Sequence, residues 1–408
     1  MYSYPKGNLR ARTRALLMAG LVAGMSTAST LMAGTATVSL GTTSQTIRGI
    51  GAASVWMGTL STTTLDKAYT TNAGCVGLTI NRVRIDPSKS WSVELANAKA
   101  AKSRGAIVFA TPWTPPASMK SNNATIHGSL NTSQYGAYAS YLNEYVKYMS
   151  DNGASLYAVS VQNEPDWDPD YESCTWSTTQ MFNFVKNNAG VINGTKLIAA
   201  ESLNFKHSYT DGILNDSTAV NNIDIVGGHL YGAGLADYSL ARSKGKDLWM
   251  TEHLNTATAI GDQMQTVKEM IDCFAVANFN AYVWWYVQRY YGPVDDSGNR
   301  TKRGAFMAQF ARWVRPGYIR VSTTYNPTSN VYVASFKSGS KVVILAVNTG
   351  TSAVSQTFAF SGGTAPTSVT PYRTSSSQDL VTLSAISVSS GSFTNSLPAQ
   401  SLTTFVSP

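Results

Sequence analysis

The stretch Leu156-Tyr-Ala-Val-Ser-Val-Gln-Asn-Glu-Pro165 passes directly from an apolar β-type run into an amide, a carboxylate and a proline. Such a strand presents Asn163 and Glu164 at its C-terminal tip, where parallel (β/α)8 barrels carry their functional side chains. A second stretch, Asp247-Leu-Trp-Met-Thr-Glu-His253, presents Glu252 in the same way. The two stretches predict an α/β barrel whose mouth holds two carboxylates.

The region from residue 47 to residue 314 has the alternation that a (β/α)8 TIM barrel needs. Eight apolar runs predict strands: Ile47–Ala53, Thr79–Ile85, Ala106–Pro112, Leu156–Val161, Lys196–Ala200, Ile223–His229, Asp247–Thr251 and Ala281–Tyr286. The strand pattern is least continuous in the first and the fifth of these runs. Between them, apolar residues recur at helical spacing in Val93–Arg104, Gln134–Met149 and Met264–Ala277. Strands alternating with helices favour a parallel sheet, and eight of them favour a closed barrel.

Residues 315–408 have a different texture, since helical periodicity disappears and turn residues become frequent. Short alternating runs predict strands at Tyr318–Ser322, Val331–Phe336, Lys341–Val347, Val354–Phe360 and Leu402–Val406. This pattern predicts an antiparallel β-sandwich attached to the side of the barrel. The alternating segment 37–46 resembles these strands, and we expect it to complete the sandwich. The Ser/Thr-rich stretch Arg373–Gln378 is expected to be a solvated loop.

Residues 1–36 have the features of a secretory signal peptide. Four basic residues precede the apolar run Ala15–Gly24, and small residues follow it up to candidate cleavage sites near Ala33 or Ala36. The alternative is an N-terminal anchor helix, but the apolar run is short for a membrane span. We therefore expect a secreted protein, either extracellular or periplasmic, that does not associate with a membrane. We also expect it to be a monomer.

Charge and cysteine content favour neither nucleic-acid binding nor a bound metal. The net charge of +8 falls to +4 once the four basic residues of 1–36 are removed, because that segment has no acidic residue. No basic run interleaved with aromatic residues is present, so we expect no nucleic-acid partner. Cys75, Cys174 and Cys273 are widely spaced and odd in number, which predicts no metal cluster or disulfide framework but leaves room for one disulfide. We expect no cofactor.

The predicted strand ends carry a polar and aromatic set of side chains. Taken singly, a glutamate there is more often a salt-bridge partner and a tryptophan is as often a core residue. Together with Glu164 and Glu252, the set comprises Asn163, Trp113, His229, Tyr231, Trp285, Arg289 and Tyr291. Carboxylates on the fourth and seventh strands can approach each other across the axis of a small barrel. A retaining glycosidase needs that pair, one carboxyl held protonated and one ionised. No Gly-x-Ser-x-Gly nucleophile, metal-ligand trio or phosphate-binding glycine loop offers another chemistry.

Several longer motifs resemble the clan A glycoside hydrolases, and specifically family 30, subfamily 8, the bacterial glucuronoxylan endo-β-1,4-xylanases. The motifs are Ile85-Asp-Pro87, Ala110-Thr-Pro-Trp-Thr-Pro-Pro116, Met119-Lys-Ser-Asn122, Val161-Gln-Asn-Glu-Pro-Asp-Trp167, Asp170-Tyr-Glu-Ser-Cys174, Gly227-Gly-His-Leu-Tyr-Gly232, Leu248-Trp-Met-Thr-Glu-His253, Ala281-Tyr-Val-Trp-Trp-Tyr286, Lys302-Arg-Gly304 and Val314-Arg-Pro-Gly317. The resemblance implies a barrel with a side β-sandwich. It also implies hydrolysis of internal xylan bonds with retention, by Glu164 as acid/base and Glu252 as nucleophile.

The same resemblance assigns substrate contacts. It implies that Asn163 binds the 2-hydroxyl of the sugar, that Tyr231 hydrogen-bonds the nucleophile, and that Trp113 and Trp285 form subsite walls. Arg289 and Tyr291 match a region that binds a glucuronic acid branch, and an arginine fork suits a carboxylate.

The loop after the predicted nucleophile departs from the family pattern. The family's Tyr is Leu254 here, the next Ser has no clear match in 255–258, and the loop is shorter. We therefore expect a preference for glucuronoxylan rather than a strict requirement for its branch. The alternatives are a xylanase of relaxed specificity or another β-glycanase on the same frame, and, from a different class, a carbohydrate-binding protein that has lost activity.

Overall fold

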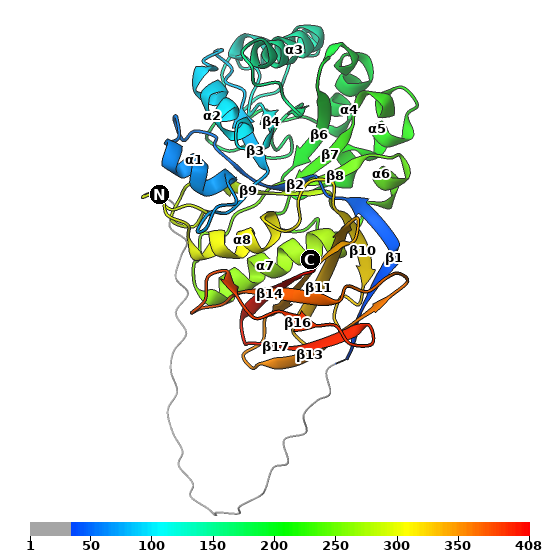
Figure 1. Cartoon of the computed structure of the whole chain (residues 1–408). Coiled ribbons are helices and arrows are strands. Elements are labelled where there is room, and N and C mark those ends of the chain that lie inside the picture. The colour runs from blue at the N-terminus through cyan, green and yellow to red at the C-terminus, as the bar shows by residue number, and fades with distance from the viewer. Residues whose placement is uncertain (1–33) are drawn as a thin grey trace, which may run out of the picture. The chain divides into compact units, whose positions relative to one another are not determined.

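The computed structural model describes residues 34–408, which contain a closed barrel and a side sheet (Figure 1). Eight parallel strands close the barrel: β2 (Gly49–Ala53), β3 (Ile80–Arg84), β4 (Ile107–Thr111), β5 (Ala158–Ser160), β6 (Lys196–Ser202), β7 (Ile225–His229), β8 (Asp247–Glu252) and β9 (Ala281–Tyr286). Strand β2 pairs with both β3 and β9, which completes the ring. The predicted (β/α)8 barrel is confirmed, and each predicted run overlaps its strand.

Helices connect the strands around the barrel (Figure 1). They are α1 (Thr62–Tyr69), α2 (Ser92–Lys102), α3 (Tyr135–Asp151), α4 (Thr178–Asn187), α5 (Asp211–Asn215), α6 (Ser239–Ser243), α7 (Ile260–Ala275) and α8 (Lys302–Ala311). Short 3-10 turns lie at η1 (Ala117–Met119), η2 (Thr132–Gln134), η3 (Ala189–Val191), η4 (His207–Tyr209) and η5 (Ala219–Asn222). Helix α4 begins with a capping box between Ser177 and Gln180, which satisfies two backbone N–H groups at its start. The three helices predicted from periodicity correspond to α2, α3 and α7.

The side sheet contains ten strands from both ends of the described chain. They are β1 (Ala36–Thr46), β10 (Ile319–Thr323), β11 (Val331–Ser338), β12 (Lys341–Asn348), β13 (Val354–Ser361), β14 (Ser368–Thr374), β15 (Val381–Thr382), β16 (Ile386–Ser387), β17 (Ser392–Leu397) and β18 (Ser401–Val406). Their order is β15-β14-β18-β12-β11-β10-β1-β13-β17, with β16 beside β14. Phe358, Phe393 and Phe405 pack together in the core, which brings strands from the two ends of this order face to face.

The side sheet differs from the prediction in two ways. It is mixed rather than wholly antiparallel, because β1 runs parallel to β13 while pairing antiparallel with β10. The expectation of a solvated loop was wrong for Arg373 and Thr374, which belong to β14, and Arg373 donates to Asn395 of β17 at 3.0 Å. The domain limits 37–46 with 315–408, and 47–314, stay predictions.

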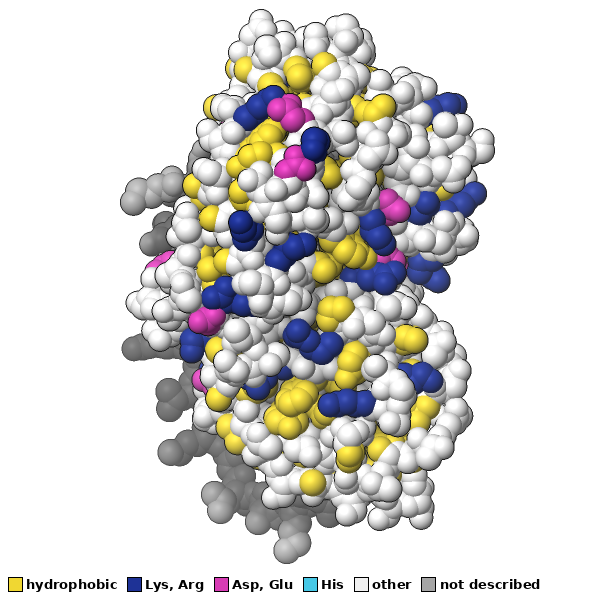
Figure 2. Space-filling model, turned by 45° about the horizontal axis from the view of Figure 1, so that its top comes forward, with side chains coloured by type: hydrophobic (Ala, Val, Ile, Leu, Met, Phe, Trp, Pro, Cys, Tyr) yellow, Lys and Arg dark blue, Asp and Glu magenta, His cyan; other side chains and the backbone are white. Residues whose placement is uncertain are grey.

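Helices α7 and α8 separate the barrel from the side sheet and contact strands of both regions. At this junction Gln309 of α8 donates to Thr374 of β14 at 2.9 Å. On the face drawn in Figure 2, Lys and Arg side chains are more frequent than Asp and Glu but stand apart among polar and apolar groups.

Three further predictions concern the signal peptide, the membrane and the cysteines. The predicted signal peptide lies almost entirely in residues 1–33, outside the described residues. Within residues 34–408, no helix is long and apolar enough to cross a membrane. Cys75, Cys174 and Cys273 are all buried free thiols, so the disulfide for which the sequence left room does not form.

Candidate active site

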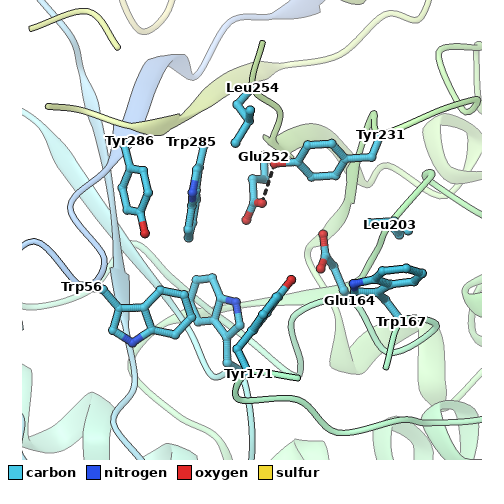
Figure 3. A pocket seen from close by; sticks show the side chains of 11 residues that line it. Trp56, Glu164, Trp167, Tyr171, Leu203, Tyr231, Glu252, Leu254, Trp285 and Tyr286 are labelled. Atoms are coloured by element: carbon cyan, nitrogen blue, oxygen red, sulfur yellow. Dashed lines mark hydrogen bonds between the residues drawn. The ribbon is translucent and has the colours of Figure 1, made fainter. Parts of the chain in front are cut away.

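The two predicted catalytic glutamates face each other at the mouth of the barrel (Figure 3). Glu252 is the last residue of β8, and Glu164 lies just beyond β5; both are buried. One carboxylate oxygen of each lies within 4.8 Å of one of the other. The backbone of Glu164 has a left-handed φ of 44°, and its N–H donates to the carbonyl oxygen of Glu201 at 3.0 Å. This bond helps to hold a conformation that is costly for a residue with a Cβ.

The Glu252 carboxylate is fixed by two donors. Tyr231 Oη donates to Glu252 Oε1 at 2.7 Å, and Arg82 Nη1 donates to Glu252 Oε2. Arg82 is fully buried, and its Nη2 also donates to Asn163 Oδ1 at 2.7 Å and to Glu201 Oε1 at 3.2 Å. A single guanidinium therefore ties the ends of β3, β5, β6 and β8 together, as its planar fork of donors permits.

Glu164 is in a different electrostatic setting. Burial raises its pKa, the negative charge of Glu252 adds to the rise, and a hydrogen bond with His229 opposes it. His229 Nδ1 lies 2.8 Å from Glu164 Oε1. The neighbouring carboxylates outweigh the burial of His229 and raise its pKa to about 9, which favours its charged form. Because His229 engages Oε1, the other oxygen of Glu164 is left to face the pocket.

Aromatic side chains form the walls of a cavity of about 630 Å³ above the glutamates. Its lining residues are Trp56, Trp113, Glu164, Trp167, Tyr171, Leu203, Tyr231, Glu252, Leu254, Trp285 and Tyr286. The ring centroids of Trp56 and Trp113 are 5.0 Å apart, and those of Trp113 and Trp285 are 5.6 Å apart. Large flat rings around two carboxyl groups suit a ligand with apolar faces and hydroxyl edges, such as a sugar chain.

The structure brings together most of the predicted site residues. Glu164, Glu252, Trp113, Tyr231 and Trp285 line the cavity.

Asn163, Arg289 and Tyr291 are not among the lining residues. Asn163 is buried beside the cavity residue Glu164, and its Oδ1 accepts a hydrogen bond from Arg82. Arg289 lies beside it, with its guanidinium carbon 4.4 Å from the ring centre of Tyr286, which does line the cavity. Tyr291 packs in the hydrophobic core, and burial raises its pKa to about 12.

Three important residues of the site were not predicted from the sequence. Arg82 lies inside the strand run Thr79–Ile85 rather than at its tip, and a charged residue within an apolar strand is the feature that would have revealed it. Glu201 directly follows the fifth run, whose pattern is weak. Trp56 follows the first run, at a position where its φ is 54°, and 40% of its surface is exposed.

Glu164, His229 and Glu252 also have the mutual spacing of a cation site, the one such group within residues 34–408. The nitrogen of His229 nearest to Glu164 is already in a hydrogen bond with it, and Glu252 is already held by Arg82 and Tyr231. These contacts suit a proton-transfer site better than a metal site.

Comparison with known proteins identifies the family. The model of the glycosyl hydrolase family 30 TIM-barrel domain matches residues 87–269. Glucuronoxylanase XynC of Bacillus subtilis strain 168 is 39% identical to the chain over 406 residues, which is 95% of each protein. The chain belongs to glycoside hydrolase family 30. The family resemblance found in the sequence motifs is therefore confirmed, and the protein is a glycoside hydrolase.

Solved structures of family 30 agree with the sequence match. The subfamily 8 xylanase Xyn30A of Clostridium acetobutylicum superposes with a TM-score of 0.88 at 46% identity, covering 91% of this chain and 99% of that one. The family 30 endoxylanase of Clostridium papyrosolvens C71 gives 0.85 at 45% identity, with the same coverage of both chains. Barrel and side sheet are thus both included in the similarity.

Proposed function

We propose that the protein is an endo-β-1,4-xylanase that hydrolyses glucuronoxylan with retention of anomeric configuration. The observation that carries this proposal is the approach of Glu164 and Glu252 within 4.8 Å in a tryptophan-walled cavity. Retaining glycosidases hold their carboxyl groups about 5–5.5 Å apart, whereas inverting ones leave about 6.5–9.5 Å for a water. The names of the similar glucuronoxylanases and endoxylanases support xylan as the polymer.

The proposed reaction has two steps. In the first, Glu252 attacks the anomeric carbon while Glu164 gives its proton to the glycosidic oxygen, which releases one chain end and leaves a xylosyl ester on Glu252. In the second, ionised Glu164 takes a proton from water, whose oxygen attacks the same carbon and frees Glu252. The raised pKa of Glu164 favours the protonated form that the first step needs.

Neighbouring side chains are proposed to orient the sugar and the nucleophile. The Oδ1 of Asn163 already accepts from Arg82, so its amide nitrogen is left to donate to the sugar's 2-hydroxyl. Tyr231 fixes the carboxylate of Glu252, and Trp113 and Trp285 supply the flat walls of the subsites.

Substitution of each glutamate tests the mechanism. Glu164→Gln and Glu252→Gln each keep the shape of the side chain but remove the proton donor or the nucleophile. We expect each to lower the release of reducing ends from glucuronoxylan by at least about a hundredfold, with an unchanged circular dichroism spectrum. Asp247→Asn, at the opposite end of β8, is the matched control and should stay active. Proton NMR of the first product formed by the native enzyme should show the β-anomer; the α-anomer would refute retention.

We propose that Arg289 binds the glucuronic acid branch. Within residues 34–408 no carboxylate lies within 4.0 Å of its guanidinium, although it stands beside the cavity wall at Tyr286. A charge-assisted hydrogen bond is worth about 1.5–3 kcal/mol, so Arg289→Ala should lower kcat/KM on glucuronoxylan by roughly 10–150-fold. The same change should leave hydrolysis of unbranched xylan almost unaltered. Arg242→Ala is the control, since Arg242 pairs with Asp237 and does not line the cavity of the two glutamates.

Leu254 makes the branch preference a partial one in this proposal. It lines the cavity with an apolar side chain where the family pattern has a Tyr hydroxyl. Identical rates and product spacing on branched and unbranched xylan would favour the relaxed-specificity alternative. No release of reducing ends from any β-glycan would favour an inactive carbohydrate-binding protein.

We also propose that residues 1–33 are removed on secretion and that the mature enzyme is a monomer. Ala36 is the first residue of β1 and is buried, so cleavage after Ala33 preserves the strand whereas cleavage after Ala36 shortens it. N-terminal sequencing of exported protein tests the cleavage site, and size-exclusion chromatography with light scattering tests the monomer.

A further inference from the structure

Glu201 is a third carboxylate beneath the two predicted catalytic glutamates. It lies in β6 with no exposed surface and does not line the cavity, so it cannot touch a bound sugar. Its Oε1 accepts from Arg82 at 3.2 Å and lies 3.8 Å from His229 Nε2, and its Oε2 accepts from Thr111 Oγ1 at 2.9 Å. Burial alone would raise its pKa, but the charges of Arg82 and His229 outweigh burial and lower it to about 2.

The chain around Glu201 is also specialised. Its φ is 51°, and its carbonyl oxygen accepts the N–H of Glu164, whose φ is likewise positive. A Cβ on Gly227 of the neighbouring strand would lie only 3.2 Å from Glu201 Cγ, so glycine at that position leaves room for the carboxylate to reach the axis. The same two residues, Glu164 and Glu201, are therefore linked through backbone as well as through His229.

The charges in this buried cluster balance only if Glu201 is counted. Arg82 and a protonated His229 supply two positive charges for three carboxyl groups, so the cluster is neutral when two of these are ionised and one, Glu164 in this proposal, keeps its proton. Without Glu201, the two cations would face one permanent anion and would draw the proton off Glu164, because an uncompensated buried charge is costly.

The groups that face the Glu164–His229 pair come from every neighbouring strand end. They are Arg82 of β3, Tyr171 of the loop after β5, Glu201 of β6, Tyr231 after β7 and Glu252 of β8. Among these, Glu201 is the anion that neither lines the cavity nor takes part in the proposed covalent steps.

We infer that Glu201 is a positioning residue that keeps Glu164 protonated by supplying a fixed counter-charge to Arg82 and His229. The inference rests on the proposed role of Glu164 as the acid. It predicts that Glu201 acts on the pH dependence of the reaction, and that it does so without contact with the substrate.

The test compares Glu201→Gln with Glu201→Asp, which keeps the charge. In kcat/KM against pH on glucuronoxylan, the alkaline limb reports the acid of the free enzyme. We expect the Glu201→Gln variant to shift that limb to lower pH by about one unit or more, since removing a buried negative charge lowers the pKa of neighbouring groups, including Glu164. The Asp variant should keep the limb near its native position even where kcat falls. Asp247→Asn, which removes a carboxylate at the far end of the barrel, should not move it.

A measurement on the native enzyme gives a readout that does not depend on activity. The chain has 4 histidines, so nitrogen NMR can follow the titration of His229. The inference requires His229 to be charged at neutral pH and its titration midpoint to fall in Glu201→Gln. A neutral His229 at pH 6 in the native enzyme, or a Gln variant that loses kcat with an unmoved alkaline limb, would overturn it. Failure of the native enzyme to cleave xylan would instead refute the proposed function and leave the NMR result to decide the role of Glu201.

Discussion

Replacing Arg82 with methionine should destabilise the protein in a way that depends strongly on pH. Methionine keeps much of the side-chain volume but removes the buried guanidinium that pairs with both Glu201 and Glu252. Removing one partner of a buried ion pair costs about 3–5 kcal/mol. The pKa of Glu201 lies at about 2 instead of its ordinary 4.5, because the charges of Arg82 and His229 outweigh burial. Arg82 therefore supplies part of a stabilisation of roughly 3 kcal/mol at neutral pH.

The direction of the pH dependence follows from the lowered pKa of Glu201. A carboxyl group with a depressed pKa stabilises the fold above its unfolded pKa and loses that contribution as the pH falls toward the folded pKa. The deficit of Arg82→Met should therefore be full at pH 7 and should shrink steadily below about pH 4.5. With an unfolding entropy of ~2.1 cal/mol/K per residue, a loss of about 3–5 kcal/mol should lower the Tm of Arg82→Met by about 4–6 °C at pH 7.

Arg303 offers a matched control for this experiment. It is also buried, but it donates to Thr266 and to backbone oxygens, and within residues 34–408 no carboxylate lies within 4.0 Å of it. Burial lowers its pKa to about 10, so it contributes no pH dependence between pH 3 and 7. Thermal unfolding of Arg303→Met should show the same loss of stability at pH 7 and at about pH 3. If the deficit of Arg82→Met is equally constant, the ion-pair reasoning is refuted.

Three other outcomes follow from local contacts. Gly227→Ala should lower the free energy of unfolding by denaturant by about 1–3 kcal/mol, because a Cβ at this position would lie 2.7 Å from a side-chain carbon of β6. Gly261→Ala in helix α7 is the control: its Cβ would meet nothing within 4 Å, so the change should be neutral or stabilising. Tyr231→Phe removes the 2.7 Å bond to Glu252 and should lower kcat/KM on xylan by roughly 10–150-fold without changing Tm by more than a few degrees. The thiol of Cys174 is buried and its pKa is raised to about 12 by that burial, so it should react with a thiol reagent only after unfolding; rapid modification of the native enzyme would contradict its placement.

The barrel could be predicted from sequence because its strands and helices have different apolar periods. Strand β9 is bounded as expected at Ala281–Tyr286, and β8 extends by one residue to Glu252. The side sheet was harder to predict. Strands β14 and β17 are rich in Ser, Thr and Asn, and their apolar residues are too few to stand out from the surrounding turns. Their pairing is decided by neighbours far away in sequence, which local patterns do not record.

The predicted site residues share one property, which is their position at a strand tip or just beyond it. Glu164, Glu252, Tyr231 and Trp113 could be found because they end an apolar run. Arg82 could not be found by that rule, since it lies in the middle of strand β3, within an otherwise largely apolar run.

The barrel interior explains why the charged residues stand where they do. Its lower layer is apolar and is formed by Ile80, Phe109, Ala158, Ile198, Ile225, Trp249, Ala281 and Val283. Side chains of a strand alternate, so the residue two positions further on points to the same axis. Two positions beyond Ile80, Phe109 and Ala158, the residues are Arg82, Thr111 and Ser160, and all three are fully buried. Strands β3, β4 and β5 thus carry an apolar residue and, directly above it, a polar one.

This layering gives the charged cluster its strength. The apolar layer excludes water from below, and the aromatic walls of the cavity limit its access from above, so the ion pairs of Arg82 act in a medium of low polarity. In such a medium a buried carboxylate as far from the substrate as Glu201 still acts on the proton of Glu164. The position of a strand tip predicts which residues meet the sugar, whereas we infer that the layer beneath governs which of them holds a proton.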